Sequence, residues 1–410
     1  MTDRMPAVSQ RSDRIASIDF WRGLYLLMIY ANHVPGNFFS YLTLRNWGFA
    51  DSAEPFIFIS GFSAMLAFGR FYDRGGFITG LCRTLKRTWQ LFGAHILLVF
   101  AMSAIIAMAG DATDGKPIME EMNFSPFFVE TNVAVVRLLN LRYMPHMTDI
   151  LPLYIALIFV FPLIWALIRV SSILALAVSA FIWVWANATG VSLANYPEGT
   201  TWFFNPIAWQ LLFVAGMVAF KERARIPHLI HSRLLFALSS SIVLFGLLAA
   251  APWAHFEAFS SWRVVPSSWL SYDVKANLSW PRVLHFFALA FLAARLFPPT
   301  SSLWQKGWVQ TISLCGRHSL PIFCGGTVLS LIVHVALRLG RLDGMASAFI
   351  TFAGFLVLIS FAWVLDRAKK RLQAVSSERR RPPCEPEETV GVIETLFPST
   401  TPELPLQKTA

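Results

Sequence analysis

The chain has 410 residues, of which 55% are hydrophobic and 14% are charged. A soluble domain carries about 25% charged residues, so this composition excludes an ordinary soluble protein. Several apolar runs are long enough to cross a bilayer, and they predict an all-α, polytopic integral membrane protein. The net charge of +10 does not indicate a nucleic-acid partner, because Lys and Arg gather in the short loops between the apolar runs and in the C-terminal tail.

We predict about ten transmembrane helices. They lie near residues 15–34, 52–70, 89–109, 149–169, 171–189, 204–220, 233–251, 280–297, 314–337 and 346–366. The loops after the second and sixth spans and the segment after the tenth are basic, and with ten spans all three lie on one side. The positive-inside rule makes that side cytoplasmic, so we predict two cytoplasmic termini. The chain is therefore expected to be a multi-pass protein of the cell inner (plasma) membrane.

The predicted organisation is a cytoplasmic N-terminal segment over residues 1–13, a membrane domain over 14–370 and a disordered cytoplasmic tail over 371–410. The tail is rich in Pro, Glu, Ser and Thr, a composition that buries too little apolar surface to fold. The four cysteines show no paired spacing. We therefore infer neither a disulfide nor a metal site from them.

The first predicted span carries Asp19, Arg22 and His33. Ionisable groups are costly inside a bilayer, so they usually mark a site or a pathway. Arg22 and His33 are eleven residues apart, which places them on one helix face, roughly 16 Å apart along the axis. Two interpretations of Arg22 stay open: an ion pair with Asp19, or a cation that faces a cavity and binds an anionic donor from the cytoplasm.

Glu54 opens the second span from the side on which the first span ends. Because the linker is short, we expect Glu54 to lie at about the depth of His33. A carboxylate beside an imidazole can orient it and raise its basicity, which suits a general base that takes a proton from a hydroxyl. The alternative is that His33 is structural and that Glu54 and Asp51 cap the N-terminus of the second span.

Further candidates lie at the ends of other predicted spans. Guanidinium groups match phosphate oxygens, so Arg83 and Arg87 after the second span could bind the same anionic donor, although positive-inside topology also explains them. The same two interpretations, functional or interfacial, apply to the remaining candidates, which are Arg317 and His318 on the cytoplasmic side and His146, Asp149 and His285 on the outer side.

Six stretches of the chain together resemble the OpgC proteins, over about residues 14–370. They are Asp19–Gly23, Asn32–Asn37, Leu44–Glu54, Phe58–Phe62, Thr148–Tyr154 and Cys315–Cys324. OpgC proteins are inner-membrane enzymes thought to add succinyl groups to osmoregulated periplasmic glucans, within a wider group of membrane acyltransferases. That group has an arginine and a histidine separated by ten residues in its first span, here Arg22 and His33, and an acidic residue in its second, here Glu54.

The resemblance implies an acyltransferase that binds no resident cofactor and uses an acyl-CoA, succinyl-CoA, as co-substrate. His33 would deprotonate a glucan hydroxyl or carry the acyl group, and Glu54 would orient His33. Arg22 would contact the donor, and the other donor-side candidates in the sequence are Asp19, Asn32, Arg83, Arg87, Arg317 and His318. The acceptor-side candidates in the sequence are His146, Asp149 and His285. Expected partners are the acyl-CoA, a glucan or other glycan, the lipid bilayer and glucan-synthesis proteins, without nucleic acid or metal.

Two other classes of function remain open from the sequence. In a transporter or flippase for a glycan or an acyl-donor molecule, Asp19, Arg22, His33 and Glu54 would form a relay instead of a catalytic site. The third possibility is a membrane scaffold for glucan-synthesis proteins. Transporters often show inverted repeats with broken spans in both halves. The polar groups here concentrate in the first span without a matching pair later, which favours the enzyme.

Overall fold

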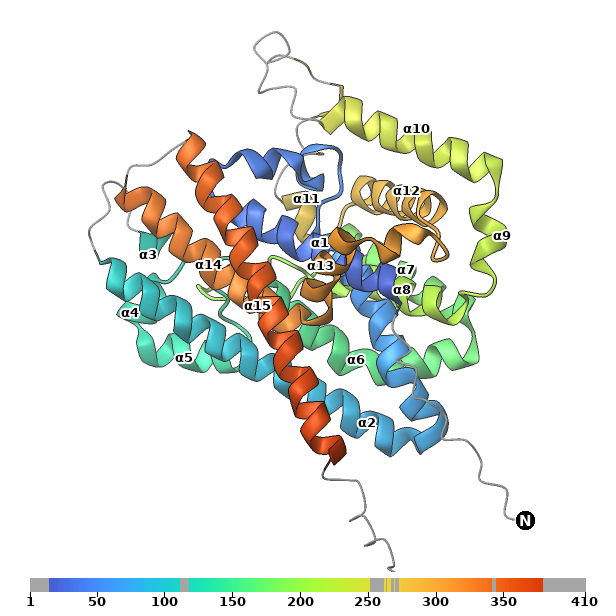
Figure 1. Cartoon of the computed structure of the whole chain (residues 1–410), viewed down its shortest axis with the longest axis horizontal. Helices are drawn as coiled ribbons and strands as arrows, with labels where there is room; N and C mark the ends of the chain where they lie inside the picture. Colours follow the sequence, from blue (N-terminus) through green and yellow to red (C-terminus); the bar gives the residue numbers. More distant parts are fainter. Residues whose placement is uncertain are drawn as a thin grey trace, which may run out of the picture. The chain divides into compact units, whose positions relative to one another are not determined.

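The computed structural model describes residues 15–110, 118–250, 262, 264–266, 269, 273–340 and 344–378, and these residues form helices and connecting turns without a β-strand (Figure 1). The all-α prediction is therefore confirmed for the described part of the chain. A helix satisfies every backbone hydrogen bond within one segment, which is what a bilayer demands of an apolar run.

The predicted spans coincide with the long helices. These are α1 (Ala16–His33), α2 (Ala53–Ala109), α6 (Ile150–Val170), α7 (Ser172–Thr189), α8 (Pro206–Lys221), α10 (Arg233–Ala250), α12 (Trp280–Leu296), α14 (Ser319–Leu339) and α15 (Gly344–Glu378). Six of them, α2, α6, α7, α10, α14 and α15, are long and apolar enough to cross a membrane. The count of ten spans and the orientation of the termini stay predictions.

Shorter helices fill the connections between the long ones. They are α3 (Ile118–Glu121), α4 (Ser125–Val129), α5 (Thr131–Leu139), α9 (Ile226–Ile230), α11 (Asp273–Ala276) and α13 (Gly307–Arg317). The predicted ninth span started at residue 314, but the structure ends α13 at Arg317 and starts α14 at Ser319. The break is His318, whose φ of −113° and ψ of 39° are not helical.

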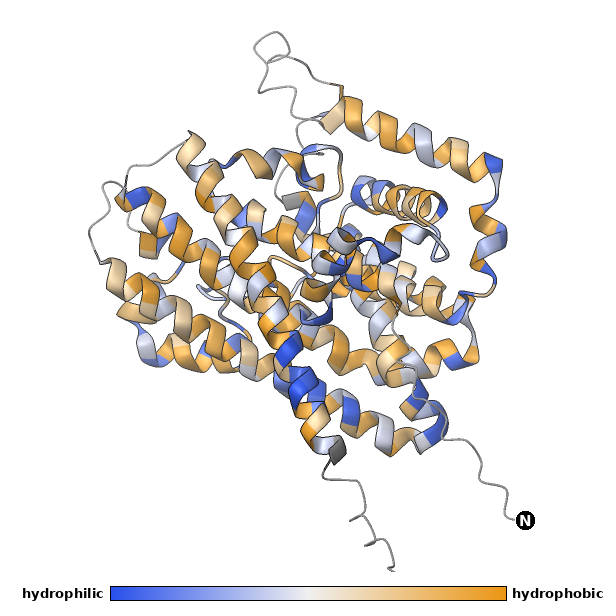
Figure 2. Cartoon of the chain, viewed as in Figure 1, coloured by the Kyte–Doolittle hydropathy of each residue, from blue (hydrophilic) through white to orange (hydrophobic). Residues whose placement is uncertain are grey.

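The second and third predicted spans both lie in α2, as two helical segments that meet at a kink without a longer loop between them. The helix is interrupted at Gly76, where φ is 79° and ψ is 166°. Glycine adopts a positive φ without a steric cost, so the chain can bend there. The residues before the bend include Arg70, Asp73 and Arg74, and α2 turns from hydrophobic to hydrophilic in this region (Figure 2).

Glycines let the helices that carry the candidate residues approach their neighbours closely. A Cβ at Gly316 of α13 would lie 1.8 Å from the backbone oxygen of Asp19, and a Cβ at Gly23 would lie 2.1 Å from the backbone oxygen of Ile312. Any larger side chain would push α1 and α13 apart. Gly61 of α2 and Gly216 of α8 make the same close approach, with a distance of 2.0 Å in each case. Backbone-to-backbone contact therefore fixes α1 against α13 and α2 against α8.

The chain divides into two compact units, residues 1–363 and 364–410. Helix α15 continues through the second unit to Glu378, and Lys370 pairs with Asp366 there at 2.8 Å. The predicted disordered tail, from residue 371, therefore starts too early. Residues 371–378 contain no Gly or Pro to end the helix, and the first proline is Pro382. The predicted N-terminal segment, 1–13, and the rest of the tail lie outside the described residues.

Candidate active site

A cavity of about 730 Å³ lies at the C-terminal end of α1. Most of its polar lining comes from loops and helix ends, which converge there from segments far apart in the sequence. The polar lining residues are Asn32, His33, Arg45, Asp51, Glu121, His146, Asp149, Lys275, Arg282 and His334. Three histidines, three carboxylates and three cations therefore line one cavity.

His33 is the last residue of α1 and is partly buried at the cavity wall. The helix ends there because Val34 is extended, with φ −91° and ψ 116°, and Pro35 and Gly36 follow. The Nδ1 atom of His33 is buried and has no hydrogen-bond partner among the described residues. The charged groups that act on the ring are Lys275, Asp51 and Arg45.

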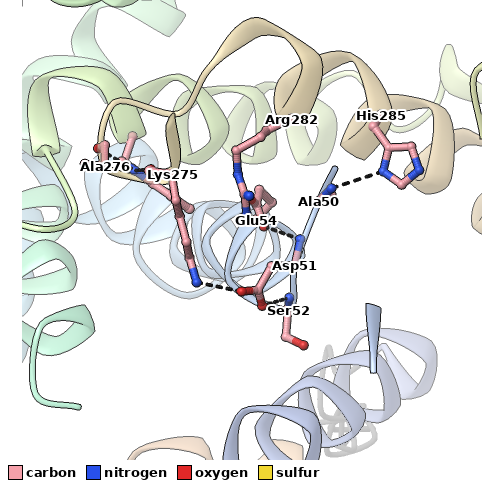
Figure 3. A network of polar contacts seen from close by, with 9 residues as sticks. Ala50, Asp51, Ser52, Glu54, Lys275, Ala276, Arg282 and His285 are labelled. Carbon is pink, nitrogen blue, oxygen red and sulfur yellow. Dashed lines mark hydrogen bonds and ion pairs between the residues drawn. The ribbon is translucent and has the colours of Figure 1, made fainter. Parts of the chain in front are cut away.

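Glu54 is fully buried and does not face His33. Its Oε1 accepts from Nε of Arg282 at 2.6 Å, and its Oε2 accepts from the backbone N–H of Asp51 at 2.8 Å (Figure 3). The expected orienting contact between Glu54 and His33 is absent from the contacts of the described residues. The bond to the Asp51 amide is the kind that caps a helix N-terminus, so the alternative interpretation of Glu54 describes its geometry better.

Asp51 is the carboxylate that shares the cavity with His33. Its Oδ2 accepts from Nζ of Lys275 at 2.6 Å, and its Oδ1 accepts from the backbone N–H of Ser52 (Figure 3). Burial alone would raise the pKa of the Asp51 carboxyl, but Lys275 and then Arg282 outweigh it and hold the pKa below its ordinary value. Asp51 is therefore an ionised group beside a histidine, the role that the sequence suggested for Glu54.

His285 lies behind the cavity wall and does not line it. Its Nδ1 accepts from the backbone N–H of Ala50 at 3.2 Å (Figure 3). A Cβ at Gly48 would lie 2.2 Å from the ring, and one at Gly246 would lie 2.6 Å from it. The imidazole thus packs between Gly48 and Gly246, and its bond to Ala50 fixes the segment before α2. This placement argues against the predicted acceptor-side role of His285 and for a positioning role.

The other two acceptor-side candidates do line the cavity. His146 has an exposed side chain, and its backbone N–H donates to the Met122 oxygen at 3.0 Å. Asp149 directly precedes α6, and burial raises the pKa of its carboxyl to about 7. The structure therefore brings His146 and Asp149 together with His33, as the sequence suggested for residues on the outer side.

A group that the sequence did not single out closes one side of the cavity. Glu121 lies 3.5 Å from Nε2 of His334 and forms an ion pair with Arg338, one turn further along α14. A second pocket of about 280 Å³ shares Pro35, Glu121 and His334 with the main cavity. The spacing of His334 and Arg338 shows that they share a helix face, but nothing in the sequence pairs that face with Glu121.

The donor-side candidates do not form one cluster. At the N-terminal half of α1, Arg317 lies 3.8 Å from Asp19, and Arg22 donates to the Ser63 hydroxyl of α2. These residues lie outside the cavity lining, which extends along α1 only as far as Ile29. His318 directly follows Arg317 and connects α13 to α14.

The remaining donor-side candidates are separated from that cluster. Asn32 lines the main cavity and accepts from the Thr43 hydroxyl at 2.7 Å, so it belongs with His33. Arg83 is exposed and stacks on the Phe71 ring at 4.8 Å. Neither Arg83 nor Arg87 lines either cavity. Their positions fit the topological interpretation of these two cations.

Comparison with known proteins gives one family. The model of the family described as OpgC protein matches residues 14–370. No curated protein and no solved structure matches the chain. The family match covers most of the sequence and includes α1, α2, α14 and every residue of the cavity lining. The resemblance seen in the motifs is confirmed, and the chain belongs to the OpgC protein family.

Proposed function

We propose that the protein is a membrane O-acyltransferase that moves a succinyl group from succinyl-CoA to hydroxyls of a periplasmic glucan. Membership of the OpgC family indicates a membrane acyltransferase-type function in glucan modification. The observation that carries the proposal is the cavity in which the His33 ring stands at a helix end beside Asp51 and Lys275. The succinyl donor, the glucan acceptor and the role of His33 are parts of the proposal.

The proposed reaction uses His33 as a general base. The imidazole takes the proton of a glucan hydroxyl while the hydroxyl oxygen attacks the thioester carbon. The new C–O bond forms, the C–S bond breaks, and the proton passes from His33 to the leaving thiolate of coenzyme A. Asp51 favours the imidazolium that exists between the two proton transfers, because an ionised carboxylate nearby stabilises the charged ring, whereas the neighbouring Lys275 disfavours it.

The donor is expected to enter past Arg22, at the other end of the same helix. Arg22→Ala should raise the KM for succinyl-CoA about tenfold or more, because hydrogen bonds to charged groups contribute roughly 1.5–3 kcal/mol. The KM for the glucan should change little. Steady-state kinetics with each substrate varied in turn measure both values, with Arg225→Ala, an exposed site paired with Glu222, as the control. An unchanged KM for succinyl-CoA would remove Arg22 from the donor site.

The proposed function is tested by comparing periplasmic glucans from a strain that lacks the gene, its parent and a complemented strain. Mass spectrometry should show that succinyl substituents disappear in the first strain and return in the third. Purified protein with succinyl-CoA and glucan should also release the coenzyme A thiol. If substituents were lost but purified protein released no thiol, a transporter of the donor or the glycan would explain the result instead.

A further inference from the structure

Three cations line the main cavity, and two of them are neutralised by carboxylates. Lys275 lies 2.6 Å from Asp51, and Arg282 lies 2.5 Å from Glu54. The guanidinium of the third, Arg45, forms no ion pair and donates no hydrogen bond to any residue in the described ranges. Its charge acts on the His33 ring. The guanidinium is therefore available to an anion that enters the cavity.

The anionic side chains of the cavity do not supply that partner. Asp51 forms an ion pair with Lys275. Glu121 forms an ion pair with Arg338 and also contacts His334. Burial raises the pKa of the Asp149 carboxyl to about 7, so a large fraction of this group is protonated at neutral pH. A positive charge thus stays without compensation from the described residues at the cavity wall, on the exposed side chain of Arg45.

The backbone that carries Arg45 is fastened to the end of α1. Arg45 belongs to the short 3₁₀ helix Leu44–Asn46. The hydroxyl of Thr43 donates to Oδ1 of Asn32 at 2.7 Å, and Nδ2 of Asn37 donates to the oxygen of Ala31 at 2.8 Å. These bonds connect the segment to Ala31 and Asn32, the two residues before His33. The backbone of Arg45 is therefore anchored relative to His33, so a ligand that binds the guanidinium has only the side chain to order.

We propose that Arg45 binds the terminal carboxylate of the transferred acyl group and so selects a dicarboxylic acyl donor. The inference rests on the proposed function, because the thioester carbon must reach His33 before transfer. The far end of the acyl group then lies inside the cavity, where Arg45 is the cation without a partner among the described residues. A guanidinium and a carboxylate match in a bidentate pair, and a methyl-terminated acyl group offers no such contact.

The test compares succinyl-CoA with butyryl-CoA, which has the same chain length without the carboxylate. Full-length protein in lipid nanodiscs is assayed with the glucan at a fixed concentration. Arg45→Gln should lower kcat/KM for succinyl-CoA about tenfold to hundredfold. The value for butyryl-CoA should change less than about twofold, and Arg45→Lys should restore part of the loss. Arg137→Gln, which removes a cation paired with Glu198 away from the cavity, is the matched control.

Three results would overturn the inference. Equal losses with both donors would show that Arg45 supports the fold or another step, and no loss with either would place it outside the site. A defect confined to a glucan that already carries acidic substituents would show that Arg45 binds the acceptor instead. If the wild-type protein turned over neither donor, the proposed function itself would fail. The three results above would overturn the inference alone, because in each of them the wild-type protein still transfers an acyl group.

Discussion

Replacing His33 with alanine should reduce acyl transfer by about 10²–10⁴-fold, the range that general bases contribute to enzymatic rates. The ring stands at the cavity wall with a buried Nδ1 and with Asp51 as the nearby ionised carboxylate. Alanine removes the only group at this position that can accept a proton. The fold should survive the change, because the side chain is partly exposed and has no hydrogen-bond partner at Nδ1 among the described residues.

The measurement is the rate of succinyl incorporation into glucan at saturating succinyl-CoA, together with the amount of protein in the membrane. His228→Ala is the matched control, because His228 is exposed on α9 and lies outside the cavity. If His33→Ala kept more than a tenth of the wild-type rate, the base would have to be sought elsewhere. His146 and His334 also line the cavity and would be the next candidates.

Breaking the pair between Glu54 and Arg282 should give the largest loss of stability. Glu54 is fully buried, and the Arg282 side chain is 11% exposed. Removing one partner of a buried ion pair costs about 3–5 kcal/mol, because the other charge remains without compensation. Glu54→Gln should therefore lower the free energy of unfolding by that amount and shift the apparent Tm of detergent-solubilised protein, measured by thermal size-exclusion, by several degrees.

Two further variants separate the pair from a general effect of losing a charge. Glu198→Gln removes a carboxylate that is 60% exposed and paired with Arg137, and exposed pairs contribute about 0–1 kcal/mol. The double change Glu54→Leu with Arg282→Met removes both buried charges and should recover part of the stability. If Glu54→Gln were as stable as Glu198→Gln, the pair would not hold the start of α2 against α12.

The positions of the long helices could be predicted from the sequence, because an apolar run in a bilayer has few alternatives to a helix. The motifs around Arg22, His33 and Glu54 also predicted the family correctly. The sequence did not predict that helix continues on both sides of Gly76, because the polar residues there resemble a loop between two spans.

The contacts within the site were harder to predict than the helices. The short linker between His33 and Glu54 suggested a pair. Glu54 instead pairs with Arg282, which lies 228 residues further along the chain. Asp51 likewise pairs with a distant residue, Lys275. Arg45 and Lys275 lie in connecting segments between predicted spans, where a cation is ordinary, so no pattern marked them as cavity residues. The packing of the helices decides which distant loop charges form pairs, so the sequence around each charge does not indicate its partner.

The face of α1 that joins Arg22 to His33 also carries Leu26 and Ile29, at helical spacing. Ile29 lines the cavity, whereas Leu26 is 3% exposed and belongs to the core. These two side chains start about 4.5 Å apart along the axis. In the proposed reaction, a thioester arriving past Arg22 therefore has one leucine to displace before it meets the imidazole. On this face of the helix, Leu26 is thus the aliphatic side chain between Arg22 and the lining of the cavity.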